Sequence, residues 1–186
     1  TWLAPVEQAE LYAQVDFWSR EVAGFDMSAV REPAANTGYP HRFDTRDLLA
    51  PGLATACCDY RAGDAQLSRG EATFTVVRAG VLHGLAAWFT AALSPTVVMT
   101  NAPGATDRIN RRNAFLPLEA PVLLRAGDIV RVSLVIRPVD FIVMWTVTCL
   151  RGDTVLAAFR QSTLKGMLVV RQDLPRGADA SPSLAS

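Results

Sequence analysis

Alternating apolar and polar residues in the middle of the chain predict β-strands. In EATFTVV (71–77), Ala72, Phe74 and Val76 alternate with Glu71, Thr73 and Thr75, and DIVRVSLVIR (128–137) has the same two-residue period. Successive side chains of a strand point to opposite faces, so each segment predicts a strand with one buried face.

Five more segments have the composition of strands: VLHGLAAWFTAAL (81–93), TVVMTN (96–101), DFIVMWTVTCL (140–150), TVLAAFR (154–160) and STLKGMLVVR (162–171). DFIVMWTVTCL is rich in apolar residues at both odd and even positions, which predicts a strand buried on both faces. Turn sequences separate them: RAGD at 61–64 and at 125–128, and RGD at 151–153. We interpret the RGD tripeptide as a hairpin turn.

The first 53 residues differ from this pattern. Residues 5–23 are typical of a helix that begins at Pro5, carries a stripe of Leu11, Val15, Trp18 and Val22, and ends at Gly24. An irregular arm follows, with a short helical turn in residues 42–52.

The predicted fold is therefore mainly β: an antiparallel β-barrel or sandwich of about eight or nine strands, with an N-terminal helix and an irregular arm. We expect the helix and arm in residues 1–53, the β-barrel domain in 54–173 and a disordered tail in 174–186.

Charge and composition limit the partners. The formal net charge is zero, which excludes a strong general attraction to nucleic acid or to an anionic membrane. The chain shows no signal peptide or long apolar span, so we expect a soluble cytoplasmic protein. Arginine greatly outnumbers lysine (Lys165 is the only one), which is typical of a high-GC bacterial genome.

Few residues suggest metal, redox or cofactor chemistry. Cys57 and Cys58 are adjacent and Cys149 is distant, so we expect buried thiols rather than disulfides. His41 and His83 lack metal-ligand spacing, and we expect His83 to be a hydrogen-bonded structural residue. Glycine-rich nucleotide motifs and a serine nucleophile elbow are both missing, so no cofactor site is predicted in this chain.

The most polar segment is DRINRRN, residues 107–113. It contains Arg108, Asn110, Arg111 and Arg112, more polar groups than a turn between strands requires. Guanidinium groups bind carboxylate, sulfate or phosphate through paired hydrogen bonds. Composition alone leaves two interpretations open, a solvated loop and an anion-binding loop.

Several motifs resemble the C-terminal half of the protein arginine methyltransferases. VDFWSREVAGFDMSAV (15–30) is similar to the family's segment W-x-x-V-Y-G-F-D-M-S, with one more residue before the glycine. VLHGLAAWFTAALSPTVVMTNAP (81–103) and RRNAFLPLEAPVLLRAGDIV (111–130) resemble the family's barrel, as does DFIVMWTVTCL. The resemblance covers roughly residues 10–165 in the family's order.

In that family a Rossmann-type domain binds S-adenosylmethionine and carries two catalytic glutamates, and a β-barrel closes the substrate cleft. This chain resembles only the barrel half, so S-adenosylmethionine is expected, if anywhere, on a partner subunit. The family's arm, which contacts the donor-binding domain of another subunit, corresponds to about residues 25–46. We therefore predict partner contacts at Trp18, Phe25, Met27 and Tyr39.

The family's Thr-His-Trp loop, which helps hold the substrate guanidinium, corresponds here to Ile109, Asn110 and Arg111. An arginine at that place would repel a cationic substrate, at a cost of roughly 1 kcal/mol in water at about 4 Å and more when partly buried. The loop suits an anionic substrate or leaving group better. We thus predict substrate contacts at Asn110, Arg111, Arg112 and Arg108, and no catalytic residue or metal ligand.

Two classes of function follow. In the first, the chain is the barrel subunit of a heterodimeric or heterotetrameric, methyltransferase-like enzyme of bacterial antibiotic biosynthesis. It closes the cleft of a separate Rossmann-type subunit around a small molecule, for example in aziridine formation with loss of sulfate or phosphate. In the second, it is a non-catalytic binding or scaffold module, and a third possibility is the barrel fragment of an arginine methyltransferase.

Overall fold

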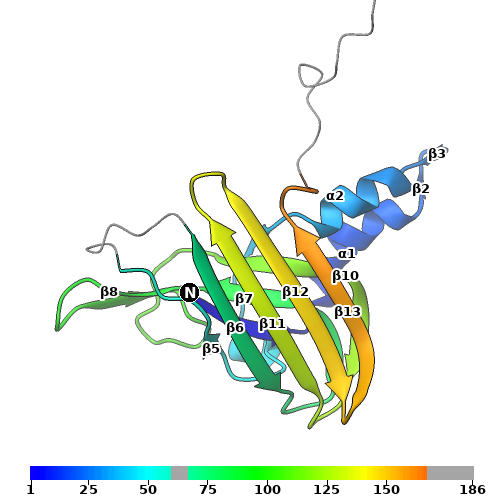
Figure 1. Ribbon diagram of the computed structural model, residues 1–186. Helices are drawn as coiled ribbons and strands as arrows, with labels where there is room; N and C mark the ends of the chain where they lie inside the picture. The colour runs from blue at the N-terminus through cyan, green and yellow to red at the C-terminus, as the bar shows by residue number, and fades with distance from the viewer. Residues whose placement is uncertain (60–66, 167–186) are drawn as a thin grey trace, which may run out of the picture.

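The computed structural model describes residues 1–59 and 67–166, which fold into two packed antiparallel sheets with two short helices at one end (Figure 1). The first sheet has five strands in the order β4-β10-β7-β1-β5. They are Tyr39–His41, Asn113–Leu124, Gly80–Trp88, Trp2–Val6 and Leu53–Ala54. The second has four in the order β13-β12-β11-β6, namely Thr154–Ser162, Ile142–Arg151, Ile129–Arg137 and Ser68–Thr75.

The predicted mainly β, antiparallel architecture is confirmed, and the two sheets form a sandwich that is not closed into a barrel. The described residues also contain two small hairpins. They are β2 with β3 (Glu21–Val22 and Phe25–Asp26) and β8 with β9 (Thr90–Ala92 and Val98–Thr100).

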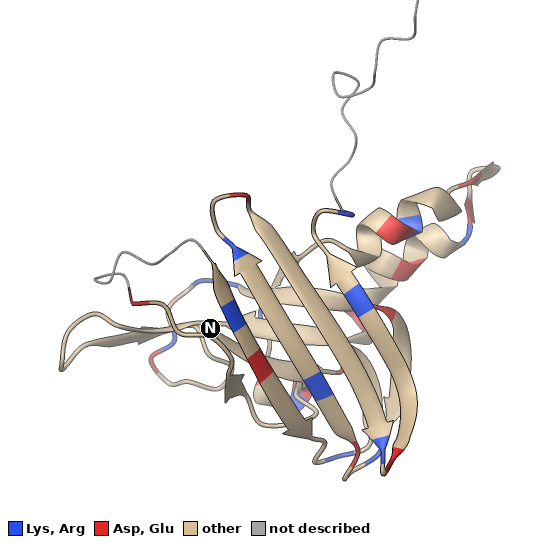
Figure 2. Ribbon diagram, viewed as in Figure 1, with Lys and Arg blue, Asp and Glu red and all other residues tan. Residues whose placement is uncertain are grey.

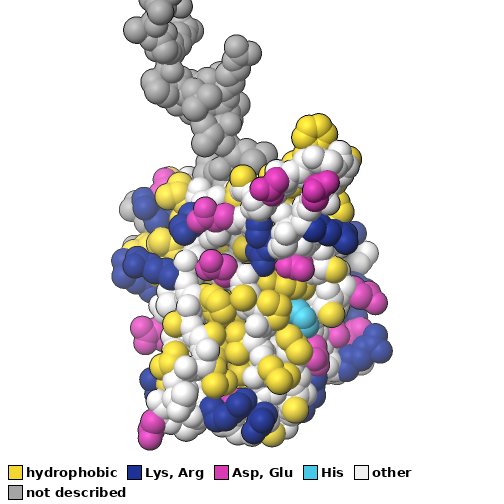
Figure 3. Space-filling model, turned by 90° about the vertical axis from the view of Figure 1, so that its right-hand side faces the viewer, with side chains coloured by type: hydrophobic (Ala, Val, Ile, Leu, Met, Phe, Trp, Pro, Cys, Tyr) yellow, Lys and Arg dark blue, Asp and Glu magenta, His cyan; other side chains and the backbone are white. Residues whose placement is uncertain are grey.

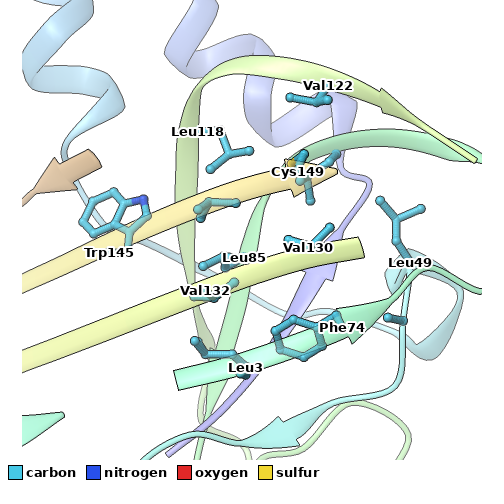
Figure 4. Close-up of a cluster of buried hydrophobic side chains, with 14 of the residues drawn as sticks. Leu3, Leu49, Phe74, Leu85, Leu118, Val122, Val130, Val132, Trp145 and Cys149 are labelled. Carbon is cyan, nitrogen blue, oxygen red and sulfur yellow. The ribbon is translucent and has the colours of Figure 1, made fainter. Parts of the chain in front are cut away.

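The main core lies between the two sheets. Figure 4 shows Leu85 and Leu118 of the first sheet facing Phe74, Val132 and Trp145 of the second. Ala72, Phe74, Val130 and Val132 are buried as the alternation predicted, while Thr73 and Arg131 are exposed. Two-residue periodicity was thus sufficient to orient β6 and β11.

The first sheet is also covered on its other face. A second cluster joins Val6, Ala86 and Phe115 of the sheet to Tyr12 of helix α1 (Ala9–Asp16) and to Phe43. This double coverage explains the almost continuous burial along β7.

The prediction that residues 5–23 form one helix was wrong at both ends. Residues 2–6 form β1, which pairs with β7 from Trp2–Trp88 to Val6–Gly84. A run of apolar residues without polar alternation fits a strand buried on both faces, and the helix begins only after Gln8. Beyond α1 a 3-10 turn, Phe17–Ser19, leads into the β2–β3 hairpin.

The irregular arm contains more regular structure than expected. Its elements are the 3-10 turn Ser28–Val30, helix α2 (Arg31–Ala35), β4 and the 3-10 turn Thr45–Asp47. The last of these is the predicted short helical turn. Both β1 and β4 belong to the five-stranded sheet, so part of the segment 1–53 is integral to the β structure.

Three local predictions were wrong. Residues 140–150 are not buried on both faces, because Trp145, Val147 and Cys149 face the core while Thr146 is exposed on the uncovered outer side of the second sheet. Cys57 and Cys58 are exposed, and only Cys149 is buried. The strand expected at 162–171 is not formed by residues 163–166, which are in a hydrogen-bonded turn, and residues 167–171 lie outside the described residues.

The turn predictions at 125–128 and 151–153 are confirmed. In the first, the Asp128 amide donates to the carbonyl of Arg125 and Gly127 has a φ of +89°. In the second, Gly152 has a φ of +57° between β12 and β13. The turn at 61–64 and the tail at 174–186 lie outside the described residues.

Candidate functional site

The polar segment 107–113 forms the end of a loop between β9 and β10. Two buried asparagines fix this loop to the sheet. The Asn101 side chain accepts a hydrogen bond from the Phe89 amide (3.0 Å) and donates to the carbonyl of Arg112 (3.0 Å). The Asn113 side chain accepts from the Phe43 amide (3.1 Å) and donates to the carbonyl of Asn101 (2.7 Å). A buried side-chain amide whose oxygen and nitrogen both have hydrogen-bond partners holds the segments around it in one arrangement.

Two of the predicted substrate residues are engaged within the protein. Arg108 donates to the carbonyl of Phe43 (3.0 Å) and forms an ion pair with Asp44 (3.5 Å). The Asn110 carboxamide oxygen accepts a hydrogen bond from Arg42 (2.9 Å). Arg108 therefore serves to anchor the loop, and Asn110 holds another arginine beside it.

The other two, Arg111 and Arg112, are exposed, and their guanidinium groups make no hydrogen bond or ion pair with any described residue. Both line an open groove of about 480 Å³. Its walls come from the ends of both sheets and include Tyr39, Pro40, Ala87, Trp88, Phe89, Ala114, Leu116, Val143 and Thr163. The groove thus lies where the sandwich is not closed, with an apolar wall and two free cations.

This arrangement suits binding better than proton transfer. Among residues 1–59 and 67–166, no carboxylate, histidine or cysteine lines the groove. The hydroxyl of Tyr39 donates to the carbonyl of Ala34 (2.8 Å), and burial raises the pKa of Tyr39 above its usual value. The described residues can therefore hold an anion here, but they place no general acid or base beside it.

A second hollow, of about 540 Å³, lies beside α2 and is less suited to a ligand. Its cation, Arg31, donates to the Tyr12 hydroxyl (2.8 Å) and to the carbonyl of Glu119 (2.6 Å). Arg31 is thereby committed to joining the helices to β10.

His83 is a buried structural residue, as predicted. Its Nδ1 accepts a hydrogen bond from the Gln8 amide (3.0 Å) at the start of α1. Burial lowers the pKa of His83, although the nearby Glu7 carboxylate acts in the opposite direction. Within the described residues, no three histidine, cysteine or carboxylate side chains gather as a metal site, and no helix is long and apolar enough to cross a membrane.

The predicted partner residues differ in exposure. Trp18 and Tyr39 pack against the small cluster of Val15, Ala34 and Ala35, so much of their surface is used internally. Phe25, in the β2–β3 hairpin, is 69% exposed. Figure 3 shows that hydrophobic side chains also gather in the middle of the face below the helices, ringed by charged residues. Partner binding at these positions remains a prediction.

Sequence reasoning missed Asn101 and Arg42. Asn101 stands in an apolar segment that resembles a strand. Arg42 lies 68 residues before Asn110, the loop residue that it contacts. The pairing of β4 with β10, in which Asn113 lies opposite His41, brings the segment of Arg42 to this loop.

Comparison with known proteins agrees with this architecture. No protein-family model matches the chain. Human protein arginine N-methyltransferase 2 is 25% identical in an alignment of 162 positions, which covers 76% of this chain and 37% of the human protein. The chain is similar to part of a protein arginine methyltransferase.

Two solved structures share the fold. One is the Trypanosoma brucei PRMT1 enzyme–prozyme heterotetrameric complex with AdoHcy (TM-score 0.63, 16% identity, 87% of this chain and 55% of that chain). The other is Arabidopsis thaliana protein arginine methyltransferase 10 (TM-score 0.60, 14% identity, 87% and 57%). The chain therefore spans little more than half the length of these structures and about a third of the human protein.

Proposed function

We propose that this chain is the barrel subunit of a heteromeric methyltransferase-like enzyme, and that it binds an anionic substrate or leaving group beside a separate Rossmann-type subunit. The observation that carries the proposal is the pair of unpartnered arginines, Arg111 and Arg112, on the rim of the groove. Unpaired guanidinium groups attract oxyanions and can bind them through two parallel hydrogen bonds.

A partner subunit accounts for what the groove lacks. The described part of the lining offers cations and apolar walls but no carboxylate, histidine or cysteine. A Rossmann-type subunit would supply the catalytic groups, and S-adenosylmethionine if methyl transfer occurs. The relative in Trypanosoma brucei is itself described as an enzyme–prozyme heterotetramer, so one solved example of this fold works with a second subunit.

The reaction that two arginines without a described partner suit best is one in which an anion leaves the substrate. In aziridine formation, an amine nitrogen attacks the neighbouring carbon, the carbon–oxygen bond breaks, and its electron pair leaves with sulfate or phosphate. The nitrogen then loses a proton to a base of the partner. Arginines fixed beside the leaving oxygen stabilise the charge that develops there. We place this activity in bacterial natural-product biosynthesis.

An affinity pull-down of the tagged chain from cells that express it natively tests the partnership. We expect a Rossmann-type methyltransferase-like protein in near-equal amount, identified by mass spectrometry. A chain that stays a stable monomer or homodimer, with no stoichiometric companion, would contradict the proposal.

The role of the arginines is tested in the reconstituted pair. Replacing both Arg111 and Arg112 with alanine should lower kcat/KM by about a hundredfold or more, because each lost charge-assisted hydrogen bond contributes roughly 1.5–3 kcal/mol. Arg131→Ala is the matched control, since Arg131 is exposed on the outer face of β11, away from the groove lining. Equal kcat/KM of the double variant and of Arg131→Ala would show that the two arginines do not contribute to activity.

The alternative of an arginine methyltransferase barrel is favoured by the similarity to the human enzyme. Against it stands the local charge, since Arg42, Arg108, Arg111 and Arg112 all lie on or beside the loop. Such a loop repels a guanidinium substrate. Transfer of a labelled methyl group from S-adenosylmethionine to arginine-rich peptides by the pair, unaffected by the double alanine variant, would establish the alternative instead.

A further inference from the structure

Arg42 is a further arginine at this loop, beside Arg108, Arg111 and Arg112, and the proposed function does not use it. Its guanidinium Nη2 donates to the Asn110 carboxamide oxygen (2.9 Å), and it forms no ion pair with a described residue. The acceptor is neutral, so the hydrogen bond fixes the position of the side chain without cancelling its charge. Arg108 differs, because Asp44 balances it.

The pairing of β4 with β10 sets Arg42 close to the groove. Asn113 lies opposite His41 and Ala114 opposite Pro40 in antiparallel register. The paired strands end at Asn113 and His41, and Arg112 and Arg42 are the next residue of each chain segment beyond that pair. Pro40, Ala114 and Arg112 line the groove, whereas Arg42 lies just beyond its lining, next to the loop that carries Arg111 and Arg112.

Three uncompensated arginines in one place repel one another. The whole chain has 18 basic and 18 acidic residues, so it has carboxylates enough to balance them. Asp107 is the only carboxylate in residues 101–113, and it makes no ion pair with a described residue. Figure 2 shows, in contrast, acidic and basic residues interspersed over the second sheet. A cluster of like charges left unbalanced by the protein is suited to balance by a ligand.

We infer that Arg42 is a specificity-determining residue, and that the site formed by Arg42, Arg111 and Arg112 selects doubly charged oxyanions over singly charged ones. The ligand class is the dianion of a phosphate monoester, or sulfate as it departs from a substrate. This inference rests on the proposed anion site and adds to it the charge of the ligand.

Binding of inorganic sulfate and of acetate to the full chain, measured by calorimetry at constant ionic strength, tests the inference. Arg42→Gln keeps an amide donor but removes the charge, and Arg42→Lys keeps the charge. We expect Arg42→Gln to weaken sulfate binding about tenfold, with little effect on acetate, and Arg42→Lys to restore most of the preference. A purely structural role of Arg42 would not change the ratio of the two affinities.

The double variant with alanine at 111 and 112 separates this inference from the proposed function. Loss of sulfate binding in the double variant, together with a lowered sulfate preference in Arg42→Gln, supports both. If sulfate binding is lost in the double variant but Arg42→Gln keeps the wild-type preference for sulfate over acetate, the inference is overturned and the proposed function stands. Sulfate binding that is absent from the wild type, or unaffected in the double variant, overturns both.

Discussion

At the scale of single residues, the loop depends on two buried asparagines, Asn101 and Asn113. Asn113 joins three segments, because its buried side chain bonds the Phe43 amide and the carbonyl of Asn101. Asn101 in turn holds the carbonyl of Arg112. Arg111 and Arg112 therefore owe their position to two neutral amides rather than to an opposite charge.

We expect Asn113→Leu to lower the free energy of unfolding by about 2–3 kcal/mol, because it leaves a buried amide and a buried carbonyl without partners. Urea denaturation measures this directly. Asn110→Ala is the control, since Asn110 is exposed and should cost no more than about 0.5 kcal/mol. Similar losses in both variants would mean that the buried amide does not organise the loop.

His83 gives stability a dependence on pH. Its Nδ1 can accept the Gln8 amide only while the ring is neutral there, and burial lowers its pKa below the usual 6.5. The unfolded chain then binds the proton more readily than the folded one. The contribution of His83 is therefore complete above pH about 6.5 and is lost as pH falls from there toward the folded pKa.

The free energy of unfolding, measured from pH 7.5 to pH 5, should accordingly fall below pH about 6.5 by no more than about 1.4 kcal/mol per pH unit from this residue. In His83→Gln the fall should be smaller. The same pH profile in wild type and variant would show that other groups determine acid stability.

At the scale of elements, two-residue alternation identified and oriented strands with one covered face, whereas of the strands covered on both faces β7 was predicted from its composition and β1 was not. β6 and β11 alternate because solvent lies on one side. β1 has sheet partners on both edges and cover on both faces, so it lacks the two-residue period and was mistaken for the start of a helix. The loop was recognised by its polarity, but Asn101 and Arg42 could not be assigned to it without the strand pairing.

The contact between β7 and β10 requires a glycine. A Cβ at Gly84 would collide with the carbonyl oxygen of Leu116 and the ring of Phe115. We expect Gly84→Ala to destabilise the protein by about 1–3 kcal/mol, as overpacking of a core does. In the control Gly38→Ala, the new methyl would lie 3.6 Å from Leu116, an ordinary contact, so thermal unfolding should change little. Equal melting temperatures for the two variants would refute this account.

At the scale of the whole molecule, the fold exposes surfaces that fit a partner. The groove is open where the sheets part, and Phe25 extends from the β2–β3 hairpin next to the helices. Apolar surface of this kind promotes association when no partner covers it. We therefore expect the chain alone to self-associate.

Phe25→Glu should reduce that self-association and weaken capture of the Rossmann-type partner, without lowering the melting temperature. The side chain is 69% exposed, so its replacement removes little core packing. Val139→Glu is the matched control, because Val139 is 72% exposed at the turn between β11 and β12, away from the hairpin. Analytical ultracentrifugation and quantitative pull-down measure the two effects. Reduced self-association with unchanged capture would indicate that Phe25 joins copies of this chain, whereas equal behaviour of both variants would remove the hairpin from either interface.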